Sequence, residues 1–496
     1  MLKALVFGIF LCHNHITFVS NMEVWQMYPE WVLAHKKKGT NISCIGGRYY
    51  LYSVGSKWNK EKGRAQKITK EYLGRITEGG LIPPKRHATK EPVSISVKEY
   101  GATNVLMELG ADVLSRLKEV FPHEADRIFT IAALRVLERC PFKRLEHFYN
   151  NSFLSEAFSR LSLSGSGLSA FLKEFGGNRE KIVEFMKSFI GEGGHVFFDG
   201  TNLISNSEKM PICRNGYNPH GGFDPQVNLL YAFSHESRQP AYYRIVPGNI
   251  RDISSFKLSV AEAGLKNVVI VADKGFGSDA NFKMLDAAQV QYIVPLKRNS
   301  TLFDPAKLET GSKASFDGYF MFNGRPVWHY SHGATVVFLD EDLKNREQKM
   351  YLQNIGNKTD GYTMGAFLEK QFKFGSIVIK TNVAKSPEEI YCLYKERGQI
   401  EQSFDFLKNL LEQDKSYMQN EKCLEAWAFI NHVSLLLNYK VYNRLRDKNQ
   451  LAKFSVADFL SHLKSIFKVK VNNSWSLSET TKKTRQLLDC LDLHIT

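Results

Sequence analysis

The spacing of apolar residues predicts helices in the first half of the chain. Between about 103 and 190, apolar side chains recur every three or four positions, as in Val105, Leu109, Val113 and Leu117. This spacing places them on one face of an α-helix. Prolines and a Ser-Gly turn interrupt the pattern several times. We therefore expect a bundle of several short helices in this part of the chain.

The pattern changes to that of strands after the glycine-rich segment 191–194. Short apolar runs follow one another, separated by turn residues, and helical patterns precede the fourth and the fifth run. The order β-β-β-α-β-α-β predicts an α/β layer. The strands are expected at 195–198, 227–233, 242–246, 267–272 and 291–295, and the helices at 252–263 and from about 278.

Three further segments have recognisable patterns. Residues 48–54 contain three Tyr, one Leu and one Val and favour a strand, and similar β-like pieces recur between about 300 and 379. Residues 423–445 are apolar on most sides of a helix, which indicates a buried helix with a structural role. A further helix is expected around 456–467.

Composition narrows the class of protein. The chain has 496 residues, 43% of them hydrophobic and 12% aromatic, with 15 prolines, which is typical of a folded protein of several domains. Lys and Arg number 66 against 51 Asp and Glu, a net charge of +15 that favours an anionic partner such as nucleic acid or an acidic membrane. The apolar run Ala4 to Cys12 is too short to cross a membrane, since about 20 residues are needed.

The positive charge is concentrated near the N-terminus. Between Lys36 and Lys98 there are 15 Lys or Arg and four acids, an excess of 15 − 4 = 11. We expect this region to contact nucleic acid. The alternative, a solvated basic surface on a small β-rich module, is the better description for any single lysine within it.

Cysteine usage favours the cytoplasm. Seven cysteines are scattered along the chain without a C-x-x-C pair, so neither a disulfide framework nor a structural zinc site is predicted. The apolar run near the N-terminus resembles a weak signal peptide, but a start codon assigned too far upstream explains it equally well. In that case Met22 or Met27 is the expected first residue.

Two aspartates directly follow apolar strands. Asp199 ends the run Phe197-Phe198, and Asp273 ends the run Ile270-Val271-Ala272. A strand-end carboxylate next to glycine suits a hard divalent cation. A single aspartate of this kind is more often a turn or helix-capping residue. Two of them in one predicted sheet favour a metal site.

A polar stripe on a predicted helix adds a third carboxylate. Tyr394, Arg397, Glu401 and Lys408 fall within an arc of about 60° when each residue turns the helix by about 100°. Lys408 lies about 10 Å along the axis from Glu401, too far to share its metal. Cations beside a carboxylate suit a phosphate backbone that passes a metal site. Ordinary solvated charges are the alternative, but they leave the common stripe unexplained.

These residues resemble a known family. The spacing Tyr394-x2-Arg397-x3-Glu401-x6-Lys408 is similar to the Y-R-E-K signature of bacterial and archaeal insertion-sequence transposases that have a DDE triad. The segments Asp199-Gly-Thr and Ala-Asp273-Lys-Gly-Phe resemble the two aspartate motifs of that family. The resemblance covers about residues 36 to 450, and the four-residue signature is its specific part.

The resemblance implies an α/β fold with a ribonuclease H-like catalytic core interrupted by a β-rich insertion. Asp199, Asp273 and Glu401 would bind two Mg2+ ions, with Mn2+ as a substitute. Tyr394, Arg397 and Lys408 would hold phosphates. The enzyme would cut double-stranded DNA at terminal inverted repeats and join the 3′ ends to target DNA, as a homodimer in the cytoplasm, associated with the nucleoid and not with a membrane.

The corresponding domain organisation combines the patterns with the resemblance. The expected parts are an N-terminal extension at 1–34, a basic DNA-contacting module at 35–100, a helical and DNA-binding domain at 101–190, the catalytic core at 191–299 and 380–450, the insertion at 300–379 and a helical tail at 451–496. Two other functions stay open: a metal-dependent nuclease of the same fold, and a transposase-derived DNA-binding protein without catalysis. The complete carboxylate set disfavours the second.

Overall fold

The computed structural model of the protein divides into two compact units, Met1–Val93 and Ser94–Thr496, and each is described by itself. The residues that the structure describes are 28–60, 62–84, 94–190, 194–205, 207–217, 223–249, 253–264, 269–398 and 415–495.

The first unit is a small antiparallel sheet with a long two-stranded extension. Its strands are β1 (Thr40–Ile45), β2 (Arg48–Asn59), β3 (Arg64–Thr77) and β4 (Gly80–Ile82), in that order, and a short helix, α2 (Glu30–Leu33), precedes them. The core consists of Val32, Ile42, Leu51 and Ile76. The strand predicted at 48–54 is the first part of β2. The far parts of β2 and β3 lie beyond this core.

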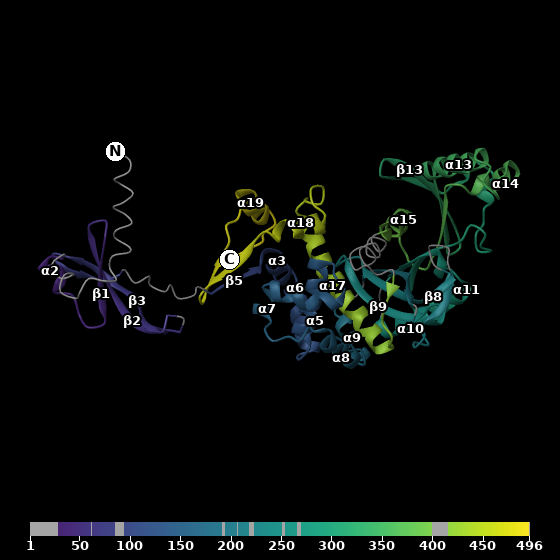
Figure 1. The fold of residues 1–496 in the computed structure, drawn as a ribbon. Helices are drawn as coiled ribbons and strands as arrows, with labels where there is room; N and C mark the ends of the chain where they lie inside the picture. The colour runs from purple at the N-terminus through teal and green to yellow at the C-terminus, as the bar shows by residue number, and fades with distance from the viewer. Residues whose placement is uncertain are drawn as a thin grey trace. The chain divides into compact units, whose positions relative to one another are not determined.

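The helices of the second unit pack around one long buried helix, α17 (Glu421–Asp447). Its apolar side chains occur on nearly all sides, so it is covered on nearly all sides. It lies against α5 (Ala125–Glu138), α8 (Gly165–Phe175) and β9 (Gln239–Pro247) (Figure 1). Helices and sheet therefore share one hydrophobic core. The other helices of the bundle are α3 (Gly101–Leu109), α4 (Ala111–Val120), α6 (Leu145–Asn151), α7 (Leu154–Ala157) and α9 (Arg179–Lys187).

Most strands of the second unit form one mixed sheet, which has 11 strands within the described residues. Besides β9 they are β6 (His195–Ser205), β7 (Arg214–Tyr217), β8 (Phe223–Ser234), β10 (Val269–Ala272), β11 (Gln291–Pro295), β12 (Gly318–Phe322), β13 (Arg325–His332), β14 (Thr335–Asp340), β15 (Ser376–Thr381) and β16 (Lys415–Ser416). The order is β12-β13-β14-β15-β11-β10-β6-β8-β7, with β9 on β8 and β16 on β6. The five strands expected from the sequence are present, and the predicted α/β class is confirmed.

The direction of the strands matters for the site. β10 is parallel to both β6 and β11, and β16 is parallel to β6, whereas the other pairs are antiparallel. The helices between the parallel strands are α10 (Ile253–Ala263) and α11 (Asp279–Ala287), close to their expected positions. The carboxyl ends of β6 and β10 consequently point the same way.

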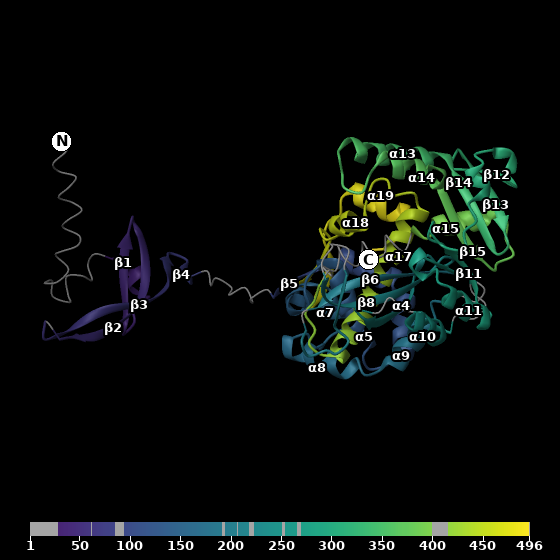
Figure 2. The ribbon, with the colours of Figure 1, turned by 90° about the vertical axis from the view of Figure 1, so that its right-hand side faces the viewer.

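The β-like pieces between 318 and 340 continue the same sheet. They form β12 to β14, and β14 joins the rest through β15, which pairs with β11. The stretch between β14 and β15 is helical and contains α13 (Glu341–Gly356) and α14 (Met364–Lys370), which lie together beside these strands (Figure 2). Asp340 starts α13, because its side chain accepts a hydrogen bond from the Leu343 N–H.

The two ends of the second unit meet in a small sheet. β5 (Ile95–Glu99) pairs with β17 (Phe467–Val471), which pairs with β18 (Ser474–Leu477). Two helices flank this sheet in sequence, α18 (Val456–Leu463) and α19 (Lys482–Cys490). Among the described residues, no helix has both the length and the apolar character needed to cross a membrane.

Candidate active site

Asp199 and Asp273 lie side by side on neighbouring parallel strands. In the register of β6 and β10, Phe198 pairs with Ala272, so the next residue on each strand is one of the two aspartates. All four residues of β10 are buried, as the apolar run predicts. Asp273 follows the strand with extended backbone and begins a short 3-10 turn, Lys274–Phe276. The sheet thus places both carboxylates at one site.

Arg397 links the two carboxylates. Its Nη1 is 2.8 Å from Asp199 Oδ2, and its Nη2 is 3.6 Å from Asp273 Oδ1. The other oxygen of Asp199 accepts a hydrogen bond of 2.8 Å from the Gly200 N–H. The Arg397 side chain is only 12% exposed, whereas Asp273 is 35% exposed. The carboxylates therefore face a common cation, and the site stays open to solvent on the Asp273 side.

Helix α15 (Pro387–Glu396) carries Arg397 to this position. A capping box of Ser386 and Glu389 starts the helix, with Pro387 at its first position. Ile390, Tyr391 and Leu393 are buried and anchor it. Tyr394 is partly buried and packs against the same core. Arg397 immediately follows Glu396, the last residue of α15.

The structure describes only the first part of the helix predicted through Tyr394, Arg397, Glu401 and Lys408. Helix α15 is bounded at Glu396, Arg397 lies in a turn with helical backbone angles, and Gly398 is again helical. The Arg397 N–H bonds back to the Tyr394 carbonyl, three residues earlier, which is the tighter 3-10 pattern. Glu401 and Lys408 lie outside the described residues, so their roles stay predictions.

The interaction of Arg397 with the aspartates was not expected. The sequence pattern assigned Arg397 to phosphate binding, but in the structure its guanidinium contacts the two predicted metal ligands. Residues 397 and 199 are 198 positions apart. A local pattern contains no information on a contact at this separation. Only the spacing of Arg397 from Glu401 indicated that it belongs to the same site.

The oxygen donors fit a hard divalent cation. Asp199 and Asp273 supply carboxylate oxygens on adjacent strands, and such oxygens are the ligands that Mg2+ and Mn2+ prefer. The guanidinium of Arg397 contacts both aspartates, so the space between their carboxylates accommodates a positive charge. With one cation for two ionised carboxylates, the three side chains have an excess of one negative charge.

The family comparison matches the part of the chain that contains this site. Residues 192–437 match the family described as Transposase DDE domain. Just under half of the chain is therefore similar to a transposase DDE domain. The match includes Asp199, Asp273 and Arg397, and the family is one of transposases, which act in DNA transposition. No curated protein matches the sequence.

Three solved structures are similar to this chain. The piggyBac transposase, in a synaptic complex with hairpin DNA, is 10% identical over 73% of this chain and 70% of that one, with a TM-score of 0.37. The Drosophila P element transposase strand transfer complex is 12% identical over 71% and 91%, with a TM-score of 0.20. The Mos1 strand transfer complex is 11% identical over 58% and 78%, with a TM-score of 0.15.

Proposed function

We propose that the chain is the transposase of a bacterial or archaeal insertion sequence. It cuts DNA at the element's terminal inverted repeats and joins the 3′ ends to target DNA, in the cytoplasm where the nucleoid lies. The observation that carries this proposal is the placement of Asp199 and Asp273 side by side within the transposase DDE domain.

The proposed catalytic set is Asp199, Asp273 and Glu401. Their oxygens would hold two Mg2+ ions, or Mn2+ in their place, and the ions would supply Lewis-acid stabilisation and an activated nucleophile for in-line displacement at phosphorus. The β9-β8-β6-β10-β11 part of the sheet is the proposed ribonuclease H-like core. The segment between β11 and β15 is the proposed insertion.

Arg397 has two tasks in this proposal. It holds Asp199 and Asp273 in position through one planar guanidinium, which can contact two carboxylates at fixed geometry. It also lies where the DNA phosphate must approach these carboxylates, with Tyr394 three residues away and Lys408 further along the chain. The three side chains are the proposed phosphate contacts at the transposon end.

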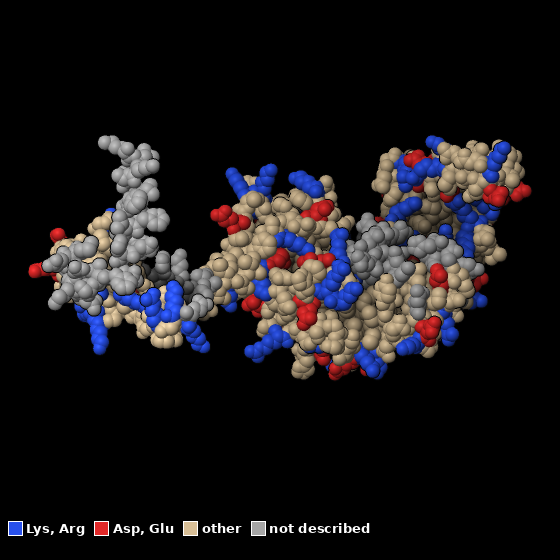
Figure 3. Space-filling view, viewed as in Figure 1, with Lys and Arg blue, Asp and Glu red and all other residues tan. Residues whose placement is uncertain are grey.

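The DNA-contacting module is proposed to be the two-stranded extension of the first unit. Every residue from Arg64 to Glu71 is exposed, and Trp58 is 63% exposed near the tip. Between 57 and 70 there are six Lys or Arg and one acid. Figure 3 shows blue side chains gathered on this unit. A basic two-stranded ribbon fits the DNA major groove and contacts its phosphates.

The helical part at 101–190 is proposed to contribute to DNA binding, and two chains are proposed to bring the paired ends together. Strand transfer joins both ends of one element to one target, so a homodimer supplies one catalytic site for each end.

One assay tests the function against its alternatives. The purified chain is incubated with Mg2+ and DNA that carries the terminal repeats flanking its gene. Products joined to target DNA support transposition. Cleavage without joining supports the metal-dependent nuclease, and intact but bound DNA supports a DNA-binding protein without catalysis.

A further inference from the structure

A second cluster of ligating side chains lies at the start of β6, away from the aspartates. His195 is the first residue of β6, and His235 and Glu236 directly follow β8. The two strands are antiparallel neighbours, with Val196 opposite Ser234, so the strand ends bring the histidines together. The His235 N–H also donates to the His195 carbonyl at 2.9 Å. One ligand atom from each of the three residues lies within 4.8 Å of the others.

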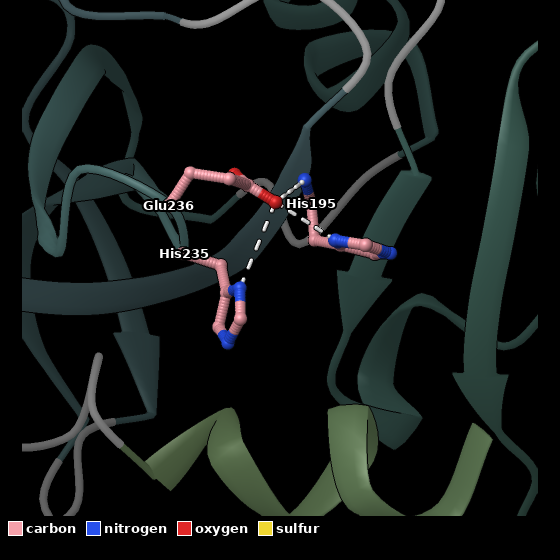
Figure 4. A group of neighbouring side chains, drawn as sticks. All are labelled: His195, His235 and Glu236. Atoms are coloured by element: carbon pink, nitrogen blue, oxygen red, sulfur yellow. Dashed lines mark hydrogen bonds and ion pairs between the residues drawn. The ribbon is translucent and has the colours of Figure 1, made fainter. Parts of the chain in front are cut away.

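Glu236 occupies the middle of this cluster. Its Oε1 is 2.8 Å from His195 Nδ1 and 3.6 Å from His235 Nδ1, and it accepts the His195 N–H at 2.7 Å. Each imidazole ring thus points its Nδ1 atom at Oε1 of Glu236 (Figure 4). A Cβ at Gly194 would collide with this carboxylate, so the glycine provides room for it. Partial burial raises the pKa of Glu236, but the His195 hydrogen bonds outweigh burial and lower it overall.

The second nitrogen of His235 is also engaged. His235 Nε2 contacts Glu396 Oε2, a carboxylate at the end of α15. Metal-bound histidines nearly always donate their other N–H to a carboxylate, a backbone carbonyl or a water molecule, which fixes the ring and its tautomer. Both ring nitrogens of His235 therefore have the surroundings expected of a metal ligand. Nδ1 faces Glu236 in the cluster, and Nε2 contacts the carboxylate of Glu396.

We propose that His195, His235 and Glu236 bind one Zn2+ ion, with Glu396 as the positioning residue for His235. Two imidazole nitrogens and one carboxylate are typical of zinc, whereas Mg2+ prefers oxygen ligands alone. The site is distinct from the aspartate pair, because Asp199 is four residues further along β6, about 13 Å at about 3.3 Å per residue. The side chains of His195 and His235 are 18% and 28% exposed, which leaves a path for the ion.

The position of the site suggests what the ion does. It would join the β6–β8 strand ends to the C-terminal end of α15, next to Arg397. The inference stands on the cluster alone and does not depend on the proposed transposase function. A chain that binds zinc but never cuts DNA would support this site and contradict that function.

Calorimetric titration of the full chain with ZnCl2, after removal of metals with a chelator and in excess Mg2+, tests the proposal. One Zn2+ per chain is expected, and X-ray absorption should show two imidazole ligands. Glu396→Gln should weaken binding about 10- to 100-fold, as is usual when a supporting carboxylate is removed. Glu236→Gln and His235→Ala, which remove a ligand, should weaken it more. His494→Ala, at an exposed histidine paired with Glu108, should bind as the unchanged chain does.

Three results would overturn the site. The first is no zinc binding by a chain that circular dichroism shows to be folded. The second is undiminished binding by both Glu236→Gln and His235→Ala. The third is loss of binding in an Asp199→Asn, Asp273→Asn double variant with the histidines intact, which would place the ion at the aspartates.

Discussion

A single guanidinium, that of Arg397, contacts both carboxylates of the Asp199 and Asp273 pair. Arg397 supplies one positive charge to two negative ones, so the three side chains together attract a further cation. The positive charge of Arg397 repels that cation and weakens the attraction. The low exposure of Arg397 strengthens both effects, because buried charges are screened less. The roles of the three side chains can therefore be separated by measuring metal binding and cleavage independently.

Loss of a carboxylate should remove cleavage and leave DNA binding. Asp199→Ala, Asp273→Ala and Glu401→Ala each remove a proposed metal ligand. The metal ions that these ligands would hold stabilise the transition state by several kcal/mol. A loss of about 4 kcal/mol slows cleavage about a thousandfold. Cleavage is measured on DNA with the terminal repeats and binding by gel shift. An active Glu401→Ala variant would refute its place in the set.

Replacing Arg397 should move metal affinity and activity in opposite directions. In Arg397→Gln the cation that competes with Mg2+ is gone, so half-saturation should need about tenfold less Mg2+. Cleavage should nevertheless fall, because the carboxylates no longer share a partner and the phosphate has one fewer cation to bind. Arg397→Lys keeps the charge and should bind Mg2+ nearly as the unchanged chain does. Equal Mg2+ affinity in all three proteins would contradict a shared guanidinium.

At the scale of elements, α15 determines where Arg397 lies. The N-terminal cap of α15 can be altered without changing any residue of the site. Ser386→Ala removes the side chain that accepts the Glu389 N–H and should destabilise the helix by about 1 kcal/mol. Amide hydrogen exchange in α15 should become faster, while exchange in α17 stays unchanged. Ser386→Asp retains a capping oxygen and serves as the control. Uniform acceleration in both helices would show that the cap affects global stability instead.

A second element-scale prediction concerns Arg179, which ties three elements together. From α9 it contacts Glu262 of α10 at 2.6 Å and Glu425 of α17 at 2.7 Å. Arg179→Met would leave Glu425 with only the hydrogen bond from the Tyr243 hydroxyl, and Glu262 with Arg244 as its remaining ion-pair partner. The side chains are 16–25% exposed, so we expect a loss of about 2–3 kcal/mol, between the values for surface and buried pairs. Arg446→Met, which breaks an exposed pair with Asp447, should change stability by less than about 0.5 kcal/mol.

The effect of Arg179→Met should depend on pH. Burial raises the pKa of Glu262, but hydrogen bonding and charge from Arg179 lower it overall, below its ordinary 4.5. A lowered pKa adds stability above the unfolded-state pKa, and this contribution is lost as the pH falls through the folded-state pKa. The two proteins should therefore differ most near pH 7 and less below about pH 4.5. Denaturation midpoints at both pH values measure the difference, and a gap that widens in acid would contradict the assignment.

The sequence predicted elements better than it predicted their partners. The strands that carry Asp199 and precede Asp273 were predicted because both runs are apolar. The strand end predicted at Asp199 was wrong, since β6 continues to Ser205 and Asp199 lies within it. The sequence pattern did not indicate that β12 to β14 extend the same sheet, because β14 joins it through β15, and pairing between distant strands has no local signal. The zinc cluster was missed for the same reason, since His195 and His235 are 40 residues apart and neither belongs to a metal-binding motif.

At the scale of the whole molecule, more than half of the net charge of +15 lies in the first unit, where residues 1–93 contain 15 Lys or Arg and six Glu, a net charge of 15 − 6 = +9. The exposed ribbon of β2 and β3 has no core of its own beyond Leu51 and Ile76, and an isolated two-stranded ribbon is only marginally stable in water. Its six basic residues carry like charges in a short ribbon and therefore repel one another. The charge of Lys67 also reaches Lys36, whose pKa is lowered mainly by burial and further by Lys67. A polyanion relieves this repulsion, so the ribbon should bind DNA through charge.

Neutralising the ribbon should weaken DNA binding in a way that depends on salt. The triple variant Lys57→Ala, Lys67→Ala, Lys70→Ala removes three exposed charges, and each lysine that no longer neutralises a phosphate should reduce the slope of log affinity against log salt by about 0.9. A reduction of up to about 2.7 is expected, measured by fluorescence anisotropy on duplex DNA from 50 to 200 mM NaCl. The same positions changed to Arg keep the charge and should keep the slope. Cleavage of pre-bound DNA at low salt should survive in both variants, because Asp199, Asp273 and Arg397 belong to the other unit; an unchanged slope in the alanine variant would exclude the ribbon as a phosphate-binding element.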